Sequence, residues 1–204
     1  MKKIMFHLIL ILPMISLNAQ KNDNPILKLW SGPYGGIPAF NDYKLKDLKP
    51  PIEAAINEKW SEVTAIANNK KPATFENTIV AMEKAGKNLS QVYTVFGIYS
   101  SNMNTPEFAP IETDMSPKFS EISNRIFQND NLFKRIETIY NSPEKKALTA
   151  EQQRLVWWYY SNFVREGAKA DKKSKARIAQ INQELAGLFT KFSQNLLNDE
   201  NENN

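Results

Sequence analysis

Residues 149–164 read TAEQQRLVWWYYSNFV, a capped segment with an unusually dense group of aromatic side chains. Thr149 and Gln152 have the spacing of a capping box, in which each side chain accepts a hydrogen bond from the other residue's backbone amide, so a helix begins here. The four consecutive aromatic residues at 157–160 then point to all sides of that helix. We expect a helix that is buried on most of its circumference, in the centre of a helical core. The functional alternative is a platform on which peptides, sugars or bases stack.

The sequence around this segment is also helical in pattern. Glycine is rare, with seven residues of which four precede residue 90, and no run of alternating β-branched residues indicates a strand. Capping residues and prolines mark helix starts, as at Thr74 and at Thr105 with Pro106. We therefore expect an all-α domain over residues 47–200 and a frayed polar tail at 201–204. The expected helices cover residues 47–68, 74–100 with a soft point at Gly86, 105–128 with a kink or restart at Pro117, 131–140, 149–167 and 171–198.

The last of these helices has a distinct apolar pattern. Its apolar residues step by three and four, which gives a narrow seam of the kind that packs against one partner helix. The seam residues are Ile178, Ile181, Leu185, Leu188, Phe192 and Leu196.

The first 46 residues have a different character. Residues 1–19 combine a positive start with an apolar stretch that is too short for a membrane span and is interrupted by Pro13, so we interpret them as a signal peptide. Residues 20–46 are rich in proline, glycine and aromatic residues, and we expect an extended arm that packs on the helices or forms a functional loop. The expected location is outside the cytoplasm, most simply the periplasm, with no membrane attachment once the leader is removed.

Histidine and cysteine, on which many enzymes depend, are almost absent. The one histidine is His7, inside the expected signal peptide, and there is no cysteine. Ser-His-Asp triads, Cys-His dyads and zinc sites built on nitrogen or sulfur are therefore excluded in the mature chain. Removal of Lys2 and Lys3 lowers the net charge from +4 to about +2, too little for a typical nucleic-acid binder. We expect no catalytic, cofactor-binding or metal-binding residue in this chain, and no nucleic-acid partner.

Three groups of polar residues are candidate sites. Pairs of carboxylates could work without histidine, but nothing places two of them across a cleft, and acidic residues on amphipathic helices usually face solvent. Arg154 and Arg165 flank the aromatic segment and could bind a carboxylate or lie at the surface. The basic residues at 169–177 could bind nucleic acid, but no aromatic residues are interleaved with them, so we interpret them as a solvated face. The members are Glu53/Glu58, Glu62/Glu76 and Glu112/Asp114, and Lys169, Lys172, Lys173, Lys175 and Arg177.

Six segments of the sequence together resemble one enzyme family. They are, in order, NPILKLWSGPYGGIPAF (24–40), PATFENTIVAMEKAGKNLSQV (72–92), SSNMNTPEFAPIETDMSPK (100–118), NDNLFKRIETIYNS (129–142), LTAEQQRLVWWYYSNFVREGA (148–168) and INQELAGLFTKFSQNLL (181–197). Over residues 24–200 the chain resembles the N-terminal region of peptidyl-dipeptidases, the dipeptidyl carboxypeptidase branch of the thimet-oligopeptidase-like M3 family of zinc metallopeptidases.

The resemblance implies an almost entirely helical enzyme whose zinc is held by two histidines of an HExxH helix and by a glutamate of a following helix, with the HExxH glutamate as general base. No position of this chain matches these residues, so none is carried over. The resemblance also implies that these helices form a wall of a deep channel that admits oligopeptides. We expect an N-terminal fragment that lacks the C-terminal zinc domain and is inactive alone. A stand-alone helical module that binds peptides or proteins is the alternative.

Overall fold

The computed structural model describes residues 24–202 except positions 29, 34–35, 39 and 43, with side chains up to residue 200. The expected signal peptide at 1–19, with His7, lies outside the described residues. Helices dominate the described part, in which the only β pairing is a single bridge between Ser31 and Ile37. The all-α prediction is confirmed.

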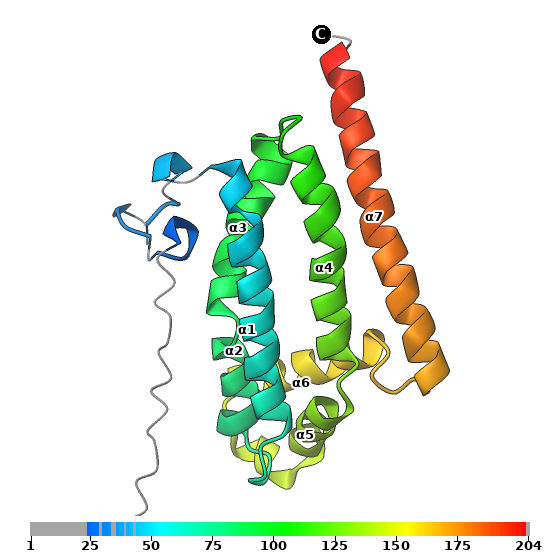
Figure 1. Ribbon diagram of the computed structural model, residues 1–204. Coiled ribbons are helices and arrows are strands. Elements are labelled where there is room, and N and C mark those ends of the chain that lie inside the picture. The colour runs from blue at the N-terminus through cyan, green and yellow to red at the C-terminus, as the bar shows by residue number, and fades with distance from the viewer. Residues whose placement is uncertain (1–23, 29, 34–35, 39, 43, 203–204) are drawn as a thin grey trace, which may run out of the picture.

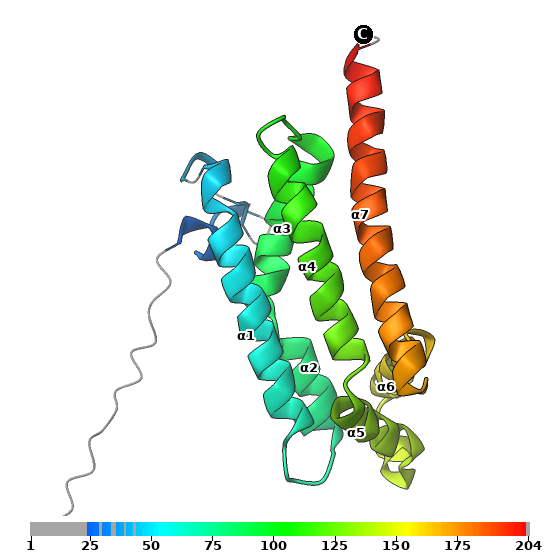
Figure 2. The ribbon, with the colours of Figure 1, turned by 45° about the vertical axis from the view of Figure 1, so that its right-hand side comes forward.

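Three helices stand side by side, and a fourth lies along one of them (Figure 1). The three are α1 (Lys49–Ala67), α3 (Lys87–Asn102) and α4 (Ala109–Phe127), and the fourth is α7 (Lys172–Glu202), which follows α4 in both views (Figure 2). A turn of π-helix (Phe75–Val80), α2 (Ala81–Lys84), α5 (Asp130–Asn141) and α6 (Ala150–Arg165) gather at one end of this group.

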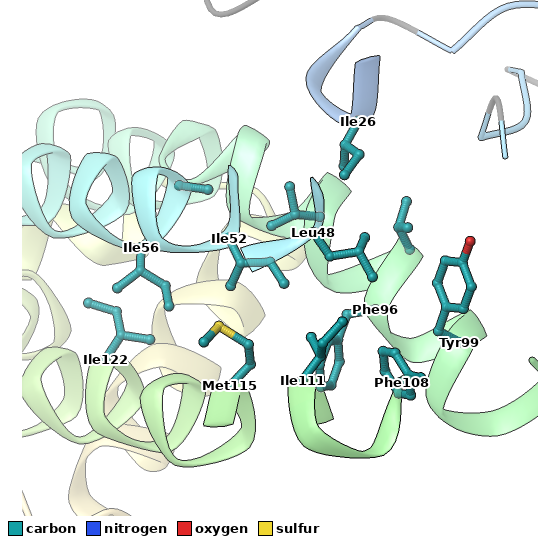
Figure 3. Packing of buried hydrophobic residues seen from close by; sticks show 13 residues of the cluster. Ile26, Leu48, Ile52, Ile56, Phe96, Tyr99, Phe108, Ile111, Met115 and Ile122 are labelled. Atoms are coloured by element: carbon teal, nitrogen blue, oxygen red, sulfur yellow. The ribbon is translucent and has the colours of Figure 1, made fainter. Parts of the chain in front are cut away.

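Two apolar cores hold these helices together. The first lies between α1, α3 and α4, where Met115 is fully buried and Ile26 of the arm enters from the side (Figure 3). The second joins the far end of α1 to the π-turn, α5 and α6, and includes Ile79, Ile136 and Phe163. Full burial of each such side chain stabilises the fold by about 1.5–3 kcal/mol, so both cores contribute strongly.

The arm before α1 is tied to the first core. Gln91 of α3 donates hydrogen bonds from Nε2 to the carbonyl oxygens of Ile26 at 2.7 Å and Lys28 at 2.6 Å. Nearer to α1, the ring of Phe40 lies edge-on to Tyr99, with ring centroids 5.9 Å apart. Side chains of α3 thus hold the arm at two points that are distant in sequence.

A buried arginine holds the loop between α1 and the π-turn in place through hydrogen bonds. Arg135 of α5 donates from Nη1 to the carbonyl oxygens of Asn69 at 2.9 Å and Lys71 at 3.0 Å. Its Nη2 donates to Oδ1 of Asn77 at 2.6 Å. The planar guanidinium satisfies two carbonyl oxygens of the loop and one side-chain oxygen of the π-turn, which fixes the loop against the second core.

The helix expected at 74–100 is broken between α2 and α3, at Ala85 and Gly86. Ala85 is extended and Gly86 has a φ of +77°, in the left-handed region that disfavours residues with a side chain. Lys59 of α1 donates from Nζ to the Ala85 carbonyl at 2.9 Å, and Glu62 accepts from the Gly86 amide at 2.6 Å. The prediction of one helix with a soft point is therefore wrong, because tertiary hydrogen bonds from α1 stabilise a turn there.

The opposite correction applies to Pro117. It lies inside α4, which continues through it, so of the expected kink or restart the restart is wrong. A proline in a helix interior removes one backbone hydrogen bond at a cost of about 3 kcal/mol or more. Because α4 packs against α1 on one side and α7 on another, tertiary packing offsets this cost.

The expected apolar seam of the last helix does not face its partner. Near the start of α7, Asn182 donates from Nδ2 to Oδ1 of Asn124 on α4 at 2.7 Å. Near its end, Gln194 donates from Nε2 to Oε2 of Glu112 on α4 at 2.9 Å, so the two helices run antiparallel. Asn124 and Glu112 are buried and need polar partners, and α7 therefore turns its polar side to α4. The seam residues other than the half-buried Ile178 are exposed: Ile181, Leu185, Leu188, Phe192 and Leu196.

Gly86→Ala is expected to lower the free energy of unfolding by about 1–3 kcal/mol. A residue with a Cβ pays about 1–2 kcal/mol in the left-handed region, and the new Cβ would also overlap Cδ of Lys59. Urea unfolding followed by circular dichroism measures the change. Gly97→Ala on α3 is the matched control, because nothing lies within 4 Å of a Cβ there, and it should be neutral or stabilising. Equal losses in the two variants would contradict the assigned role of Gly86.

Candidate functional site

A groove of about 680 Å³ lies where α3, α4 and α7 meet. Tyr93 of α3 forms one side: it is 56% exposed, and its ring packs edge-on against Phe119 with centroids 4.9 Å apart. Ser116, Ser120 and Ser123 bring three hydroxyl groups from one face of α4. The surface is thus apolar and aromatic, with hydroxyl groups at helical spacing.

Lys59 is the one charged residue among those that line this groove. Burial lowers the pKa of its ammonium group, and the nearby carboxylates of Glu62 and Glu83 partly oppose that shift. The same ammonium group already donates to the Ala85 carbonyl at 2.9 Å. The groove can therefore hold an apolar or extended ligand by packing and hydrogen bonding.

A second groove of about 820 Å³ adjoins the first at the break between α2 and α3. The two share Ala85, Gly86 and Ser90. The second is more polar, because charged residues of α2 and the start of α3 line it together with Trp30 of the arm. The break between α2 and α3, which side chains of α1 stabilise, therefore lines both grooves.

The first two carboxylate pairs of the sequence analysis are not brought together across a cleft. Of the four carboxylates in these two pairs, three each bind a separate neighbouring residue, and one lies exposed on the π-turn. Glu53 pairs with Lys118, Glu58 accepts from the Asn88 amide, Glu62 accepts from the Gly86 backbone, and Glu76 is the exposed one. Glu53, Glu58 and Glu62 thus act as structural acceptors, and neither pair is placed for acid–base chemistry.

The third pair is split between the inside and the outside of α4. Glu112 is buried and accepts hydrogen bonds from the Ser100 hydroxyl and the Gln194 amide. Asp114 lies on the exposed side, where a hydrogen bond from Lys49 at 2.7 Å lowers the pKa of its carboxyl group. Residues two positions apart point to different sides of a helix, so these two carboxylates cannot act on one substrate atom.

The aromatic segment of α6 is mostly structural. Tyr159 is buried and donates from its hydroxyl to Oε1 of Glu83 at 2.6 Å, while Tyr160 stacks on Tyr140 with centroids 3.9 Å apart. Burial, reinforced by Glu83, raises the pKa of Tyr159 far above its ordinary value. The expected burial thus holds for Tyr159, whereas Tyr160 is half-buried and Trp158 is 48% exposed. The prediction of a helix buried on most of its circumference is therefore wrong, because the buried residues of α6, Val156, Tyr159 and Phe163, share one face.

The arginine and lysine residues that are candidates for ligand binding mostly contact other residues of this chain. Arg154 stacks its guanidinium on the ring of Trp157 at 3.9 Å, whereas Arg165 is exposed at the end of α6. In the basic run, three residues have acidic neighbours and four of the five are exposed, which fits a solvated face rather than a continuous binding patch. Lys169 pairs with Glu137, Lys175 with Asp130 and Arg177 with Glu184, and all five residues except Lys175 are exposed, Lys172 and Lys173 included.

The sequence alone did not predict the groove between α3, α4 and α7. Its clearest signal was the spacing of Ser116, Ser120 and Ser123, which places three small hydroxyl side chains on one face of a helix. That spacing does not say which helix lies opposite. Tyr93 carried no signal of its own, since an aromatic residue at helical spacing is usually a core residue.

Neither a metal centre nor a membrane span is found in the part of the chain that the structure describes. No group of three or more histidine, cysteine, aspartate or glutamate side chains there is arranged to hold a metal ion. Nor is any described helix both long enough and apolar enough to cross a membrane.

The chain is similar to bacterial peptidases. It is 32% identical over 174 residues to dipeptidyl carboxypeptidase of Escherichia coli (strain K12), and 31% identical over 174 residues to the Salmonella typhimurium protein of that name. Each match covers 85% of this chain and 25% of the relative. Oligopeptidase A of Escherichia coli is 22% identical over 161 residues, 79% of this chain and 24% of that protein. No family model matches.

The chain thus spans about a quarter of the length of these curated relatives and corresponds to their N-terminal region. These matches confirm the resemblance that the six sequence segments indicated.

Raising the pH above about 10 is expected to destabilise the protein through Tyr159. Its pKa is raised in the fold, so its contribution is complete below the ordinary tyrosine value of 10.0 and is lost as the pH rises toward the higher folded value. Urea unfolding between pH 9 and 11 should show an added slope approaching about 1.4 kcal/mol per pH unit. Tyr159→Phe should remove that slope, whereas Tyr93→Phe, at an exposed position, should keep it. The same slope in wild type and Tyr159→Phe would contradict the assignment.

Proposed function

We propose that this chain, a homologue of the M3-family peptidases, forms a wall of the substrate channel in an exported zinc peptidase that removes dipeptides from the C-terminus of oligopeptides. The observation that carries the proposal is the match with two dipeptidyl carboxypeptidases over 85% of the chain. The similarity to oligopeptidase A supports the broader statement that the substrate is a peptide. Export rests on the signal-peptide pattern at 1–19.

The groove between α3, α4 and α7 is the surface that would face the peptide. The helical rise places Ser116 and Ser123 about 10 Å apart, which is roughly the length of three residues of extended peptide. An extended peptide has unpaired backbone donors and acceptors, and the serine hydroxyls can donate to it or accept from it. The exposed ring of Tyr93 adds apolar contact area for side chains. Because the one lining cation, Lys59, has its own partner, the groove would not select peptides by charge.

The residues present here do not fit a zinc site. The described part holds no suitable cluster of ligands, and the one histidine, His7, lies outside it. Zinc would supply the activated water in a complete peptidase. This chain's own contribution would be to position the peptide and to limit the width of the channel, so that only unfolded segments enter.

A stand-alone module that binds peptides or proteins is the second candidate, and the exposed Tyr93 groove favours it. Isothermal titration of the purified chain with mixed oligopeptides separates the two. A channel wall alone should give no saturable heat at high peptide concentration. A binding module should give saturable heat that Tyr93→Ala weakens and that Trp158→Ala, on the separate helix α6, leaves unchanged.

Activity is expected only when the chain is joined to a catalytic part. The purified chain with zinc should not hydrolyse a blocked tripeptide above a boiled control. A chimaera in which this chain replaces the matching quarter of the Escherichia coli dipeptidyl carboxypeptidase should release the C-terminal dipeptide. In that chimaera Tyr93→Ala should raise KM by roughly 3–10-fold with little change in kcat, because it removes packing that substrate and transition state share.

The control in the chimaera is Trp158→Ala, an exposed aromatic residue outside the groove, which should leave KM unchanged. A folded chimaera without activity would count against the channel-wall assignment. Turnover by the isolated chain would refute the claim that it is inactive alone.

A further inference from the structure

We propose that the second groove, at the break between α2 and α3, binds an acidic side chain of the peptide whose neighbouring residues lie in the first groove. The groups that would hold this carboxylate are the ammonium groups of Lys84 and Lys87, with the hydroxyl of Ser90 beside them. The inference rests on the proposed function and adds a substrate preference to it, because the first groove would not select peptides by charge.

The two lysines differ from most other cations of the chain in having no partner. Both are exposed, and within the described residues neither forms an ion pair. Lys59, which lies next to the same break, is already bound to the Ala85 carbonyl. Each of the two free ammonium groups therefore has three N–H donors available to a ligand.

Glu83 is the one acidic residue among the described residues that line the second groove, and a hydrogen bond holds it toward α6. Its Oε1 accepts from the hydroxyl of Tyr159 at 2.6 Å, and Tyr159 is buried. Turning Glu83 to the lysines would leave that buried hydroxyl without a partner. The lining thus keeps a net charge of +1, from two lysines and one glutamate, with the negative charge on the α6 side.

The other polar side chains of the lining are either occupied or able to donate. Gln91 donates to two carbonyl oxygens of the arm, and the Thr94 hydroxyl donates to the Ser90 carbonyl at 3.0 Å. The side chains with no hydrogen bond inside the described part all carry a donor, and they are Trp30, Lys84, Lys87 and Ser90. Free donors and positive charge favour a negatively charged acceptor, and in a peptide that acceptor is a carboxylate.

The two grooves form one path along α3. They share Ala85, Gly86 and Ser90. Lys87, Ser90 and Tyr93 follow one another at steps of three, so successive members are neighbours on the helix surface. The helical rise separates Lys87 from Tyr93 by about 9 Å, which is roughly the length of three residues of extended peptide. An acidic side chain about three residues from the one that packs on Tyr93 would therefore reach the lysines.

The carboxylate is assigned to a side chain rather than to the C-terminus of the peptide. Removal of a dipeptide places that terminus two residues, or about 7 Å, from the bond that is cut. The zinc must lie at that bond, and the described part of this chain holds no cluster of metal ligands. The acidic residue is accordingly placed on the N-terminal side of the cleaved bond.

Carbodiimide crosslinking of the full chain tests the site without requiring activity. The probe is a short peptide with a blocked N-terminus, an amidated C-terminus, no lysine and one aspartate. The reagent joins the aspartate carboxylate to a nearby lysine amine as an amide, with loss of water, and mass spectrometry identifies the lysine. The yield at Lys84 and Lys87 should exceed that at the exposed Lys172 and Lys173 of α7 several-fold, because the groove concentrates the carboxylate.

A second probe distinguishes the two sources of a carboxylate. It has asparagine in place of aspartate and a free C-terminus, and it should give no excess yield at Lys84 and Lys87. An excess with this probe would place the C-terminal carboxylate in the groove and overturn the assignment to a side chain. Equal yields of the aspartate peptide at the two pairs of lysines would overturn the site itself.

The chimaera with the Escherichia coli dipeptidyl carboxypeptidase shows whether the site affects catalysis. In a series of neutral peptides, aspartate is introduced in turn at each position before the cleaved bond. At one position KM should fall roughly 3–10-fold below that of the asparagine peptide, as two exposed ion pairs predict. The preference should shrink at roughly 0.5 M salt, which screens exposed charges.

Lys84→Gln/Lys87→Gln should abolish this preference, with an unchanged circular dichroism spectrum because both positions are exposed. Lys172→Gln/Lys173→Gln is the matched control, an equal loss of charge at exposed positions of α7, and it should keep the preference. A chimaera that cleaves peptides without any preference for aspartate would overturn this inference and leave the proposed function intact. Selective crosslinking together with an inactive, folded chimaera would support the site and count against the channel wall.

Discussion

Two side chains of α1 hold the turn on which much of the structure depends. Lys59 donates to the backbone at the end of α2, and Glu62 accepts from the amide of Gly86. Without these bonds the polar groups of the break would be unsatisfied in a partly buried place. The turn sets where α3 starts and therefore where Tyr93 lies. Ala85 and Gly86 of that turn line both grooves, and α3, which follows it, contributes Val92, Val95 and Phe96 to the first core.

A second constraint comes from polar groups buried on α4. Glu112 and Asn124 are buried, and a buried polar group without a hydrogen bond costs about 1–3 kcal/mol or more. Gln194 and Asn182 of α7 satisfy them. The same contacts turn the apolar side of α7 away from the bundle. Satisfying polar groups inside the fold thus leaves an apolar surface outside it.

These constraints separate structural residues from the surfaces available for function. Tyr159 is buried and bound to Glu83, so it is not free to meet a ligand, whereas Arg154 is stacked on Trp157 but remains exposed. What the described fold presents outward is a hydroxyl-lined groove and an apolar helix face. Such surfaces position and bind partners, which agrees with homology to the N-terminal region of peptidases.

The sequence by itself determined the helical class, several helix starts and the family. The capping box at Thr149 and Gln152 forms as expected, because its hydrogen bonds join residues three positions apart. Only the tertiary structure decided that the helix breaks at Gly86, that α4 continues through Pro117 and that the seam of α7 faces outward. Periodicity identifies residues that share a face, but what covers that face depends on groups distant in the chain. The groove and the exposed seam both come from such distant contacts.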